Sequence, residues 1–206
     1  MKRKTILKKL KMLGIDYQDF DNYQLLEIKK ALIFNKQNIK TNRFIDIKLV
    51  ARSSFDYKQI ALIRNILMSY PDIDISILLK NNFNYDQMYQ VLLGLIENLN
   101  VSLYAKEEYN FYQMFEIRSG LIEKIDVSSY LNPRLNHLQM HEIRMALWFN
   151  KRMPSNYQIS IQQMTKSSQN YLEMKKFREK SKSEIIERYL KQYPAKRKLL
   201  ERARLI

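Results

Sequence analysis

The sequence predicts an all-α protein: a solenoid-like array of short helix pairs, with helical extensions at both ends. A phrase beginning Gln-Met recurs every 26 residues, at Gln87, Gln113 and Gln139, and two diverged copies begin at Gln24 and Gln59. Apolar residues follow each Gln at helical spacing. The 206 residues include only 3 Gly and 4 Pro, as a helix-rich chain would. Short repeated units of this kind are typical of stacked helical arrays.

A basic N-terminal helix is expected within residues 1–19. Apolar residues and lysines alternate at helical spacing between Lys4 and Leu13, and Gly14 is placed to end the helix. No apolar run near this end is long enough for a signal peptide. No stretch approaches the ~18 apolar residues that a membrane-spanning helix needs, so no membrane contact is expected.

Five repeats within residues 20–152 each predict one main helix that starts with a capping box. An Asp or Asn accepts a hydrogen bond from the third helical residue, and the Gln at that position reaches back to the cap's backbone N–H. Apolar residues before the cap and after the Gln add a hydrophobic staple. We number the repeats 1 to 5 from these caps, which are Asp21, Asp56, Asn84, Asn110 and Asn136.

Each main helix is expected to be followed by a shorter helix and to pack on the next repeat. Apolar residues four and eight positions after the Gln complete one buried stripe. The residue seven after the Gln is small in four repeats, which predicts a close approach of neighbouring helices, since a mid-helix Gly otherwise costs about 1 kcal/mol. These small residues are Ala31, Gly94, Gly120 and Ala146, and the expected caps of the shorter helices are Asp74, Asn100 and Asp126.

Residues 153–206 are expected to form a basic helical C-terminal extension. The phrase Ile159-Ser160-x-x-Gln163-Met164 indicates a decayed sixth repeat that would shield the end of the array. A further helix is predicted from Ser181, with Glu184 completing its capping box and Pro194 ending it. A last basic helix is expected within residues 195–206.

Charge and cysteine content narrow the class of protein. The chain has no Cys, which excludes disulfides, thiol catalysis and Cys-ligated metals, and which fits a cytoplasmic protein. The net charge of +15 is unevenly distributed: +8 in residues 1–58, −3 in 59–150, +2 in 151–174 and +8 in 175–206. The repeats are therefore nearly neutral and the two ends are basic.

The basic ends are the predicted binding surface. Ends of this charge favour contact with phosphate, on nucleic acid or on a nucleoprotein, and the alternatives are a solubilising surface or an acidic protein partner. No RNA-recognition aromatic pair, zinc finger or basic zipper is present to sharpen the choice. The residues predicted to bind are Lys8, Lys9, Lys11, Arg178, Arg188, Lys191, Lys196, Arg197, Lys198 and Arg202.

A second set of cations recurs five residues after the Gln. One interpretation is a basic ladder along stacked helices that binds phosphate or carboxylate. The other, which we favour because the middle of the chain is net acidic, is pairing with glutamates of neighbouring repeats. The cations are Lys29, Arg64, Arg118 and Arg144, and the glutamates are Glu27, Glu116 and Glu142.

Catalytic and metal-binding constellations are weak in this sequence. His137 and His141 have the i, i+4 spacing of a metal pair, but no Cys or third His could complete a site, so two ordinary polar positions are the favoured interpretation. No phosphate-binding glycine loop and no nucleophile–His pair is present, so we predict no catalytic residue, no cofactor and no enzymatic activity. Trp148 and the tyrosines could stack on bases, but several of them, Tyr85, Tyr104, Tyr109 and Tyr130, lie at repeat positions expected to be buried or half-buried, where a role in the core is favoured. Tyr189 and Tyr193 are the better candidates for stacking.

The phrases Gln113-Met114-x-Glu116-Ile117-Arg118-x-Gly120-Leu121 and Asp126-Val127-Ser128-x-Tyr130 resemble a repeat of proteins from phages and conjugative elements of Gram-positive bacteria. The resemblance covers roughly residues 20–150, and repeat 2 departs from it. It implies a mobile-element origin, so that phage counter-defence, including inhibition of a CRISPR effector, becomes a candidate function.

Three hypotheses follow for the function. The first is a non-enzymatic repeat protein that binds a host nucleoprotein and inhibits a CRISPR-type defence. The second is a DNA- or RNA-binding accessory protein of element transfer or replication. The third is a protein–protein scaffold. The sequence indicates neither the identity of the partner nor the oligomeric state.

Overall fold

The computed structural model describes residues 3–41, 43–80, 82–167 and 170–206. Within these ranges every regular element is an α-helix or a short 3-10 helix (η), and none is a strand, so the prediction of an all-α protein is confirmed. The chain divides into two compact units, an N-terminal unit of residues 1–98 and a C-terminal unit of residues 99–206.

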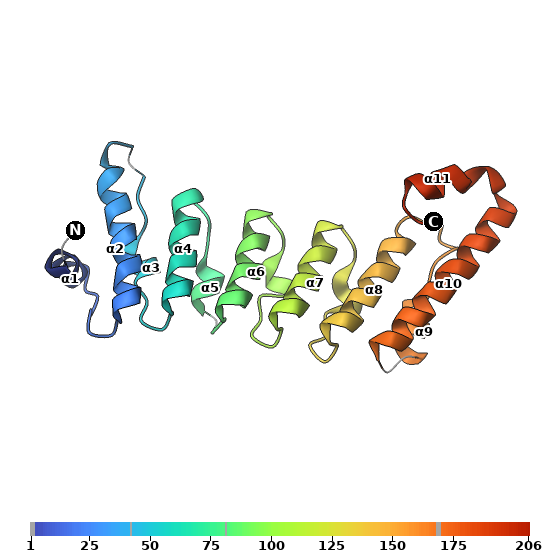
Figure 1. Cartoon of the computed structure of the whole chain (residues 1–206), viewed down its shortest axis with the longest axis horizontal. Coiled ribbons are helices and arrows are strands. Elements are labelled where there is room, and N and C mark those ends of the chain that lie inside the picture. The colour runs from blue at the N-terminus through green and yellow to red at the C-terminus, as the bar shows by residue number, and fades with distance from the viewer. Residues whose placement is uncertain (1–2, 42, 81, 168–169) are drawn as a thin grey trace. The chain divides into compact units, whose positions relative to one another are not determined.

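In the N-terminal unit the main helices of repeats 1 to 3 pack in sequence order, α2 on α4 and α4 on α6 (Figure 1). The predicted N-terminal helix is confirmed as α1, which packs on α2, buries Ile6 and Leu10, and is followed by Gly14 at φ +72°. The elements are α1 (Arg3–Met12), α2 (Asn22–Gln37), η1 (Ile39–Thr41), α3 (Ile47–Val50), α4 (Tyr57–Ser69), α5 (Ser76–Lys80) and α6 (Tyr85–Ile96).

In the C-terminal unit α7 packs on α8 and α8 packs on α10, while the short α9 contacts both α8 and α10. After α10 the chain reverses, and α11 lies back alongside the end of α10 (Figure 1). The elements are η2 (Val101–Leu103), α7 (Phe111–Ile122), η3 (Val127–Tyr130), α8 (His137–Asn150), α9 (Ile161–Ser167), α10 (Tyr171–Gln192), η4 (Pro194–Lys196) and α11 (Arg197–Arg202).

All five predicted capping boxes are present. In repeat 1 the Gln24 N–H donates to Asp21 Oδ1 at 2.8 Å, and the Asp21 N–H donates to Gln24 Oε1 at 2.7 Å. A capping box accepts either Glu or Gln at this position. Capping alone therefore does not explain why all five repeats have Gln.

For Gln24, Gln59 and Gln113 the amide nitrogen explains the choice, because it links one repeat to the next. Gln24 Nε2 donates to the Phe55 carbonyl at 2.5 Å, and Gln59 Nε2 donates to the Phe83 carbonyl at 2.6 Å. In the C-terminal unit Gln113 Nε2 donates to the Leu135 carbonyl at 2.7 Å. Each acceptor is the staple residue just before the next cap. A Glu could cap its own helix but has no hydrogen to donate to the following repeat.

The short helices fill the space beside the main helices. Their caps are confirmed at Asp74 and Asp126, whose carboxylates accept from the N–H groups of Ser76 and Ser128, whereas Asn100 makes no side-chain cap. These hydrogen bonds lower the pKa of both aspartates. Asp46 caps α3 in the same way, and Ser160 precedes α9. Four residues after each of these five positions lies a fully buried side chain: Val50, Leu78, Tyr104, Tyr130 and Met164.

The small residue at Gly120 has a different neighbour from the one expected. A Cβ built on Gly120 would overlap the Tyr130 hydroxyl and would lie 2.9 Å from Val127 Cγ1. Both residues belong to η3 of the same repeat, so the glycine makes room for its own short helix rather than for a neighbouring main helix. The Tyr130 hydroxyl donates to the Glu116 carbonyl on α7 at 3.4 Å.

Repeats 1 and 5 share an insertion closed by an asparagine clamp. Asn35 Nδ2 donates to the Ile45 carbonyl and its Oδ1 accepts from the Ile45 N–H, both at 2.8 Å. Asn150 makes the same two bonds to Ile159, at 2.8 and 2.6 Å. Both asparagines lie eleven residues after the Gln of their repeat. The clamp places α9 in repeat 5 at the position that α3 has in repeat 1.

The predicted start of a sixth repeat at Ile159 is therefore wrong. Ser160 does accept from the Gln163 N–H, at 3.3 Å, but it begins the short helix of repeat 5. The sixth main helix is α10, where Asn170 accepts from the Glu173 N–H at 3.1 Å and Met174 is buried.

The predicted helix start at Ser181 is also wrong. Helix α10 runs without a break from Tyr171 to Gln192, so Ser181 lies in its middle. The predicted stop is confirmed, since α10 ends before Pro194 and η4 begins there. The expected last basic helix is present as α11.

Candidate nucleic-acid and protein interface

Five of the predicted binding residues lie together at the end of the C-terminal unit. They occupy the last turn of α10, η4 and α11, and each is exposed. Within the described part of the chain, none of them makes an ion pair. The five are Lys191, Lys196, Arg197, Lys198 and Arg202, and we call them the terminal cations. Because these cations have no partner among the described residues, an anionic ligand can bind them without breaking an ion pair.

Arg188 is exposed but is held in place by the loop before α9. Its Nη2 donates to the Asn156 carbonyl at 3.1 Å, and its guanidinium lies 5.0 Å from the centre of the Tyr157 ring. The Tyr157 hydroxyl also bonds the Gln192 side chain. Arg188 therefore joins this loop to α10, and it still has exposed surface for a partner.

Arg178 was predicted to lie on the binding surface, and the structure places it in the interior instead. Its side chain is buried, its Nε lies 2.7 Å from Glu142 Oε2, and its Nη1 lies 2.8 Å from Glu179 Oε1. Glu142 belongs to α8, so this pair ties α10 to the preceding main helix. The physical reason is burial: an unpaired charge in this position would be strongly unfavourable.

The same pair recurs between other repeats. Arg64 Nη2 lies 2.7 Å from Glu27 Oε2, and Arg144 Nε lies 2.8 Å from Glu116 Oε2. In each of these two pairs the Glu lies three residues after the capping-box Gln of one repeat. The Arg lies five residues after the Gln of the next repeat. The favoured interpretation, pairing between repeats, is thus confirmed for Arg64 and Arg144. Arg118 is buried and Lys29 half-buried, so neither forms part of an exposed basic ladder.

These pairs set the ionisation of their carboxylates. Burial alone would raise the pKa of Glu116, but hydrogen bonds from His141 and Arg144 and the charges of both residues outweigh it, so the pKa lies below its ordinary value. For Glu27, hydrogen bonds from Lys30 and Arg64 likewise outweigh burial and lower the pKa. Both carboxylates are therefore charged at neutral pH and strengthen the pairing with their arginines.

The two histidines have separate roles. His137 stacks on Tyr112 with ring centres 4.8 Å apart, and His141 Nδ1 lies 3.3 Å from Glu116 Oε1. Across the residues that the structure describes, no group of three or more His, Cys, Asp and Glu side chains could hold a metal ion. The i, i+4 spacing of the histidines thus reflects contacts with neighbouring repeats.

The stacking candidates divide into one buried and one exposed residue. Tyr189 is buried between the rings of Tyr157 and Tyr193, with both pairs of ring centres 5.1 Å apart, so it is not available to a base. Tyr193 is exposed beside the terminal cations. Trp148 is covered by Arg152, whose guanidinium carbon lies 3.6 Å from the ring centre.

The predicted N-terminal lysines lie on α1 of the other unit. Lys8 and Lys11 are exposed, and Lys9 is half-buried. Lys9 and Lys36 line a hollow of about 650 Å³ between α1 and the end of α2.

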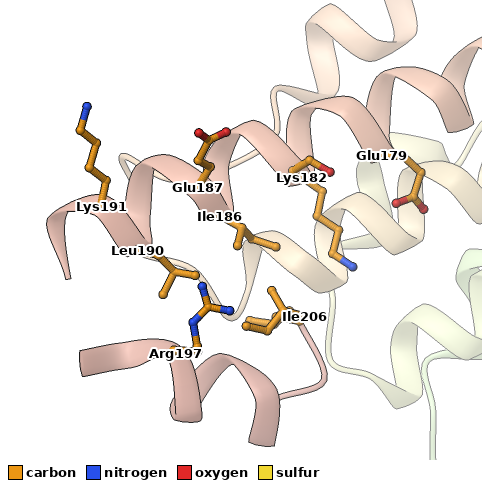
Figure 2. A pocket seen from close by; sticks show the side chains of 10 residues that line it. Glu179, Lys182, Ile186, Glu187, Leu190, Lys191, Arg197 and Ile206 are labelled. Carbon is orange, nitrogen blue, oxygen red and sulfur yellow. The ribbon is translucent and has the colours of Figure 1, made fainter. Parts of the chain in front are cut away.

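A groove that the sequence did not indicate lies between α10 and α11. It has a volume of about 820 Å³, and Figure 2 shows side chains from both helices facing into it. Ile186 and Leu190 come from α10, and Leu205 and Ile206 come from the segment after α11. The signal available in the sequence was the recurrence of apolar residues in both segments, but periodicity does not show that the chain reverses at Tyr193 and brings them together.

No described helix is long and apolar enough to cross a membrane. Comparison of the chain with protein-family models, with curated proteins and with solved structures finds no match.

Proposed function

We propose that this chain is a non-enzymatic binding protein of a phage or mobile element, a solenoid-like array of helix pairs that binds a host nucleoprotein and inhibits a CRISPR-type defence effector in the bacterial cytoplasm. The observation that supports this most is the group of five terminal cations without ion pairs. Phosphate groups are the natural counterpart of such a group. The resemblance of the repeats to those of mobile-element proteins supports the host context.

The distribution of paired and unpaired charges also supports a binding role. The repeats use their buried arginines to join neighbouring helices, which stabilises the scaffold. Five exposed cations without ion pairs to any described residue lie together where the last repeat ends. A nucleoprotein presents phosphate and protein surface side by side, so a scaffold with a charged end can contact both.

A cleavage assay tests the proposal directly. CRISPR effector ribonucleoproteins from Gram-positive hosts would be assembled with guide RNA and target DNA, and cleavage would be measured with increasing amounts of the protein. We expect inhibition by the wild type and at least a tenfold weaker inhibition by a tail variant, Lys196→Glu, Arg197→Glu, Lys198→Glu and Arg202→Glu combined.

The matched control places the same charge change elsewhere. Lys40, Lys48, Lys58 and Lys106 are also exposed, and their combined change to Glu gives the same net charge. This distributed variant should inhibit nearly as well as the wild type. Undiminished cleavage at a large excess of folded wild-type protein, with every effector, would contradict the proposal.

A second candidate function is an accessory protein that binds naked DNA or RNA during element transfer or replication. The exposed ring of Tyr193 beside the terminal cations favours it, because aromatic stacking combined with basic residues is the usual mode of binding single strands. It requires tight, salt-sensitive binding to an oligonucleotide without any protein partner.

A further inference from the structure

The groove between α10 and α11 includes the terminal cations Lys191 and Arg197 in its lining, but its chemistry differs from that of the terminal cations outside it, Lys196, Lys198 and Arg202. Its floor is aliphatic, formed by Ile186, Leu190, Leu205 and Ile206. In Figure 2 Arg197 points from α11 toward Leu190 and Ile206, and the Lys182 side chain reaches down toward Ile206 from the other helix. Two cations thus face an apolar floor from opposite sides.

The carboxylates that line the groove do not neutralise these cations. Glu187 points away from α11, as does Lys191, and Glu179 lies beyond Lys182 at the far end (Figure 2). Glu179 is also paired with the buried Arg178, at 2.8 Å. In the part of the chain that the structure describes, Lys182 and Arg197 form no ion pair. The interior of the groove is therefore positive as well as apolar.

The lining does not suit nucleic acid. None of the ten residues that line the groove is aromatic, so it offers no platform on which a base could stack. An aliphatic floor instead favours burial of an aliphatic side chain, and the flanking cations favour carboxylates. An amphipathic helix laid into a groove combines both features.

Resting on the proposed function, we infer that this groove binds an acidic, amphipathic segment of the protein part of the nucleoprotein. One aliphatic side chain of that segment lies on Ile186 and Leu190, and a carboxylate lies between Lys182 and Arg197. The terminal cations outside the groove bind phosphate, so protein and nucleic acid are held at adjacent but separate sites.

A labelled peptide tests this inference. The probe is a fluorescein-labelled helical peptide of about 14 residues, roughly four turns, with Leu on one stripe and Glu on both flanks. Its affinity for the full chain would be measured by fluorescence anisotropy. Arg197→Glu should weaken binding at least tenfold, whereas Lys198→Glu, the same charge change on the neighbouring residue outside the groove, should weaken it less than threefold. Replacing the Leu stripe of the peptide with Ser should also abolish binding.

An oligonucleotide arm separates this inference from the proposed function. Binding of a labelled oligo-dT should fall more with Lys198→Glu than with Arg197→Glu, and it should be unaffected by Ile186→Ser, which should weaken binding of the peptide. The groove assignment is overturned if the wild type does not bind the peptide, if both charge reversals act equally on it, or if Ile186→Ser weakens oligo-dT as much as the peptide. Peptide binding that persists while the wild type inhibits no effector would overturn the proposed function alone.

Discussion

The arginines of the C-terminal unit occur in two environments. Arg144 and Arg178 are buried against glutamates of the preceding main helix, while Arg197 and Arg202 are exposed on α11 without an ion pair to any described residue. The difference is the partner: a Glu three residues after the Gln of repeats 4 and 5 pairs with Arg144 and Arg178, whereas no carboxylate among the described residues pairs with Arg197 or Arg202. The same type of side chain therefore joins neighbouring main helices at Arg144 and Arg178, and is exposed without an ion pair to any described residue at Arg197 and Arg202.

The largest expected effect comes from replacing one arginine in each environment. Arg144→Met leaves Glu116 buried without its main partner, and breaking a buried pair in this way costs roughly 3–5 kcal/mol. Arg197→Met should change the free energy of unfolding by less than about 0.5 kcal/mol, because its side chain is exposed. Urea unfolding of both variants measures the difference. Equal stabilities would show that the buried pairs do not hold the repeats together.

A second test concerns packing rather than charge. Gly120→Val should destabilise the C-terminal unit by about 1–3 kcal/mol through overpacking against Tyr130 and Val127. Adding Tyr130→Phe removes the nearest atom and should recover part of the loss. Thermal unfolding measures both variants. An unchanged melting temperature for Gly120→Val would mean that η3 can move aside without loss of stability.

A third test compares an internal repeat with the terminal one. Gln113→Glu keeps the capping box but removes the donor to the part-buried Leu135 carbonyl, and the loss of this hydrogen bond should cost about 1 kcal/mol. Glu173→Gln makes the opposite exchange at the equivalent, exposed position of α10. It should change the free energy of unfolding by less than about 0.5 kcal/mol. If both exchanges had equal effects on urea unfolding, the Gln link between repeats would not explain the repeated Gln.

The smallest expected effect is the loss of stability that acid causes by protonating the buried glutamates. The pKa of Glu116 in the folded protein lies below its ordinary value of 4.5, so its stabilising contribution is complete above that value and is lost as the pH falls through the lowered pKa. The wild type should thus lose stability between about pH 5 and pH 3, and Glu116→Gln should lose less over that interval. Melting temperatures across this range test the sign, and a steeper loss in Glu116→Gln would contradict it.

Local features of the fold could be predicted from the sequence, and so could the long-range pairing of Arg64 and Arg144 with glutamates of the preceding repeats, because the repeat pattern aligns them. Other long-range features could not. The capping boxes and the stop before Pro194 depend on residues within one turn. Arg178 was misplaced because its burial depends on Glu142, which is 36 positions away. The sixth repeat was missed because Glu173 replaces the Gln and an insertion lengthens the spacing from repeat 5. Asn150 occupies the same repeat position as Asn35, and this match could have indicated the insertion.

The proposed binding surface was predictable only as a set of charged residues. Its exposed members on η4 and α11 were identified from composition, but the groove beside them depends on a chain reversal that has no periodic signature. The misplaced residues, Arg178 and Tyr189, are those whose environment comes from another segment of the chain.

A nucleic-acid titration is the most direct test of the central claim, that the terminal cations bind phosphate while the cations of the repeats serve the fold. Binding of single-stranded and duplex DNA and RNA would be measured by fluorescence at roughly 50 and 200 mM salt, for the wild type, the tail variant and the distributed variant. We expect salt-sensitive binding by the wild type and the distributed variant. In the tail variant the logarithmic salt slope for duplex DNA should fall by about 0.9 for each phosphate that the protein no longer neutralises. Equal affinities and equal slopes for the tail and distributed variants would contradict the claim, because net charge alone would then account for the binding.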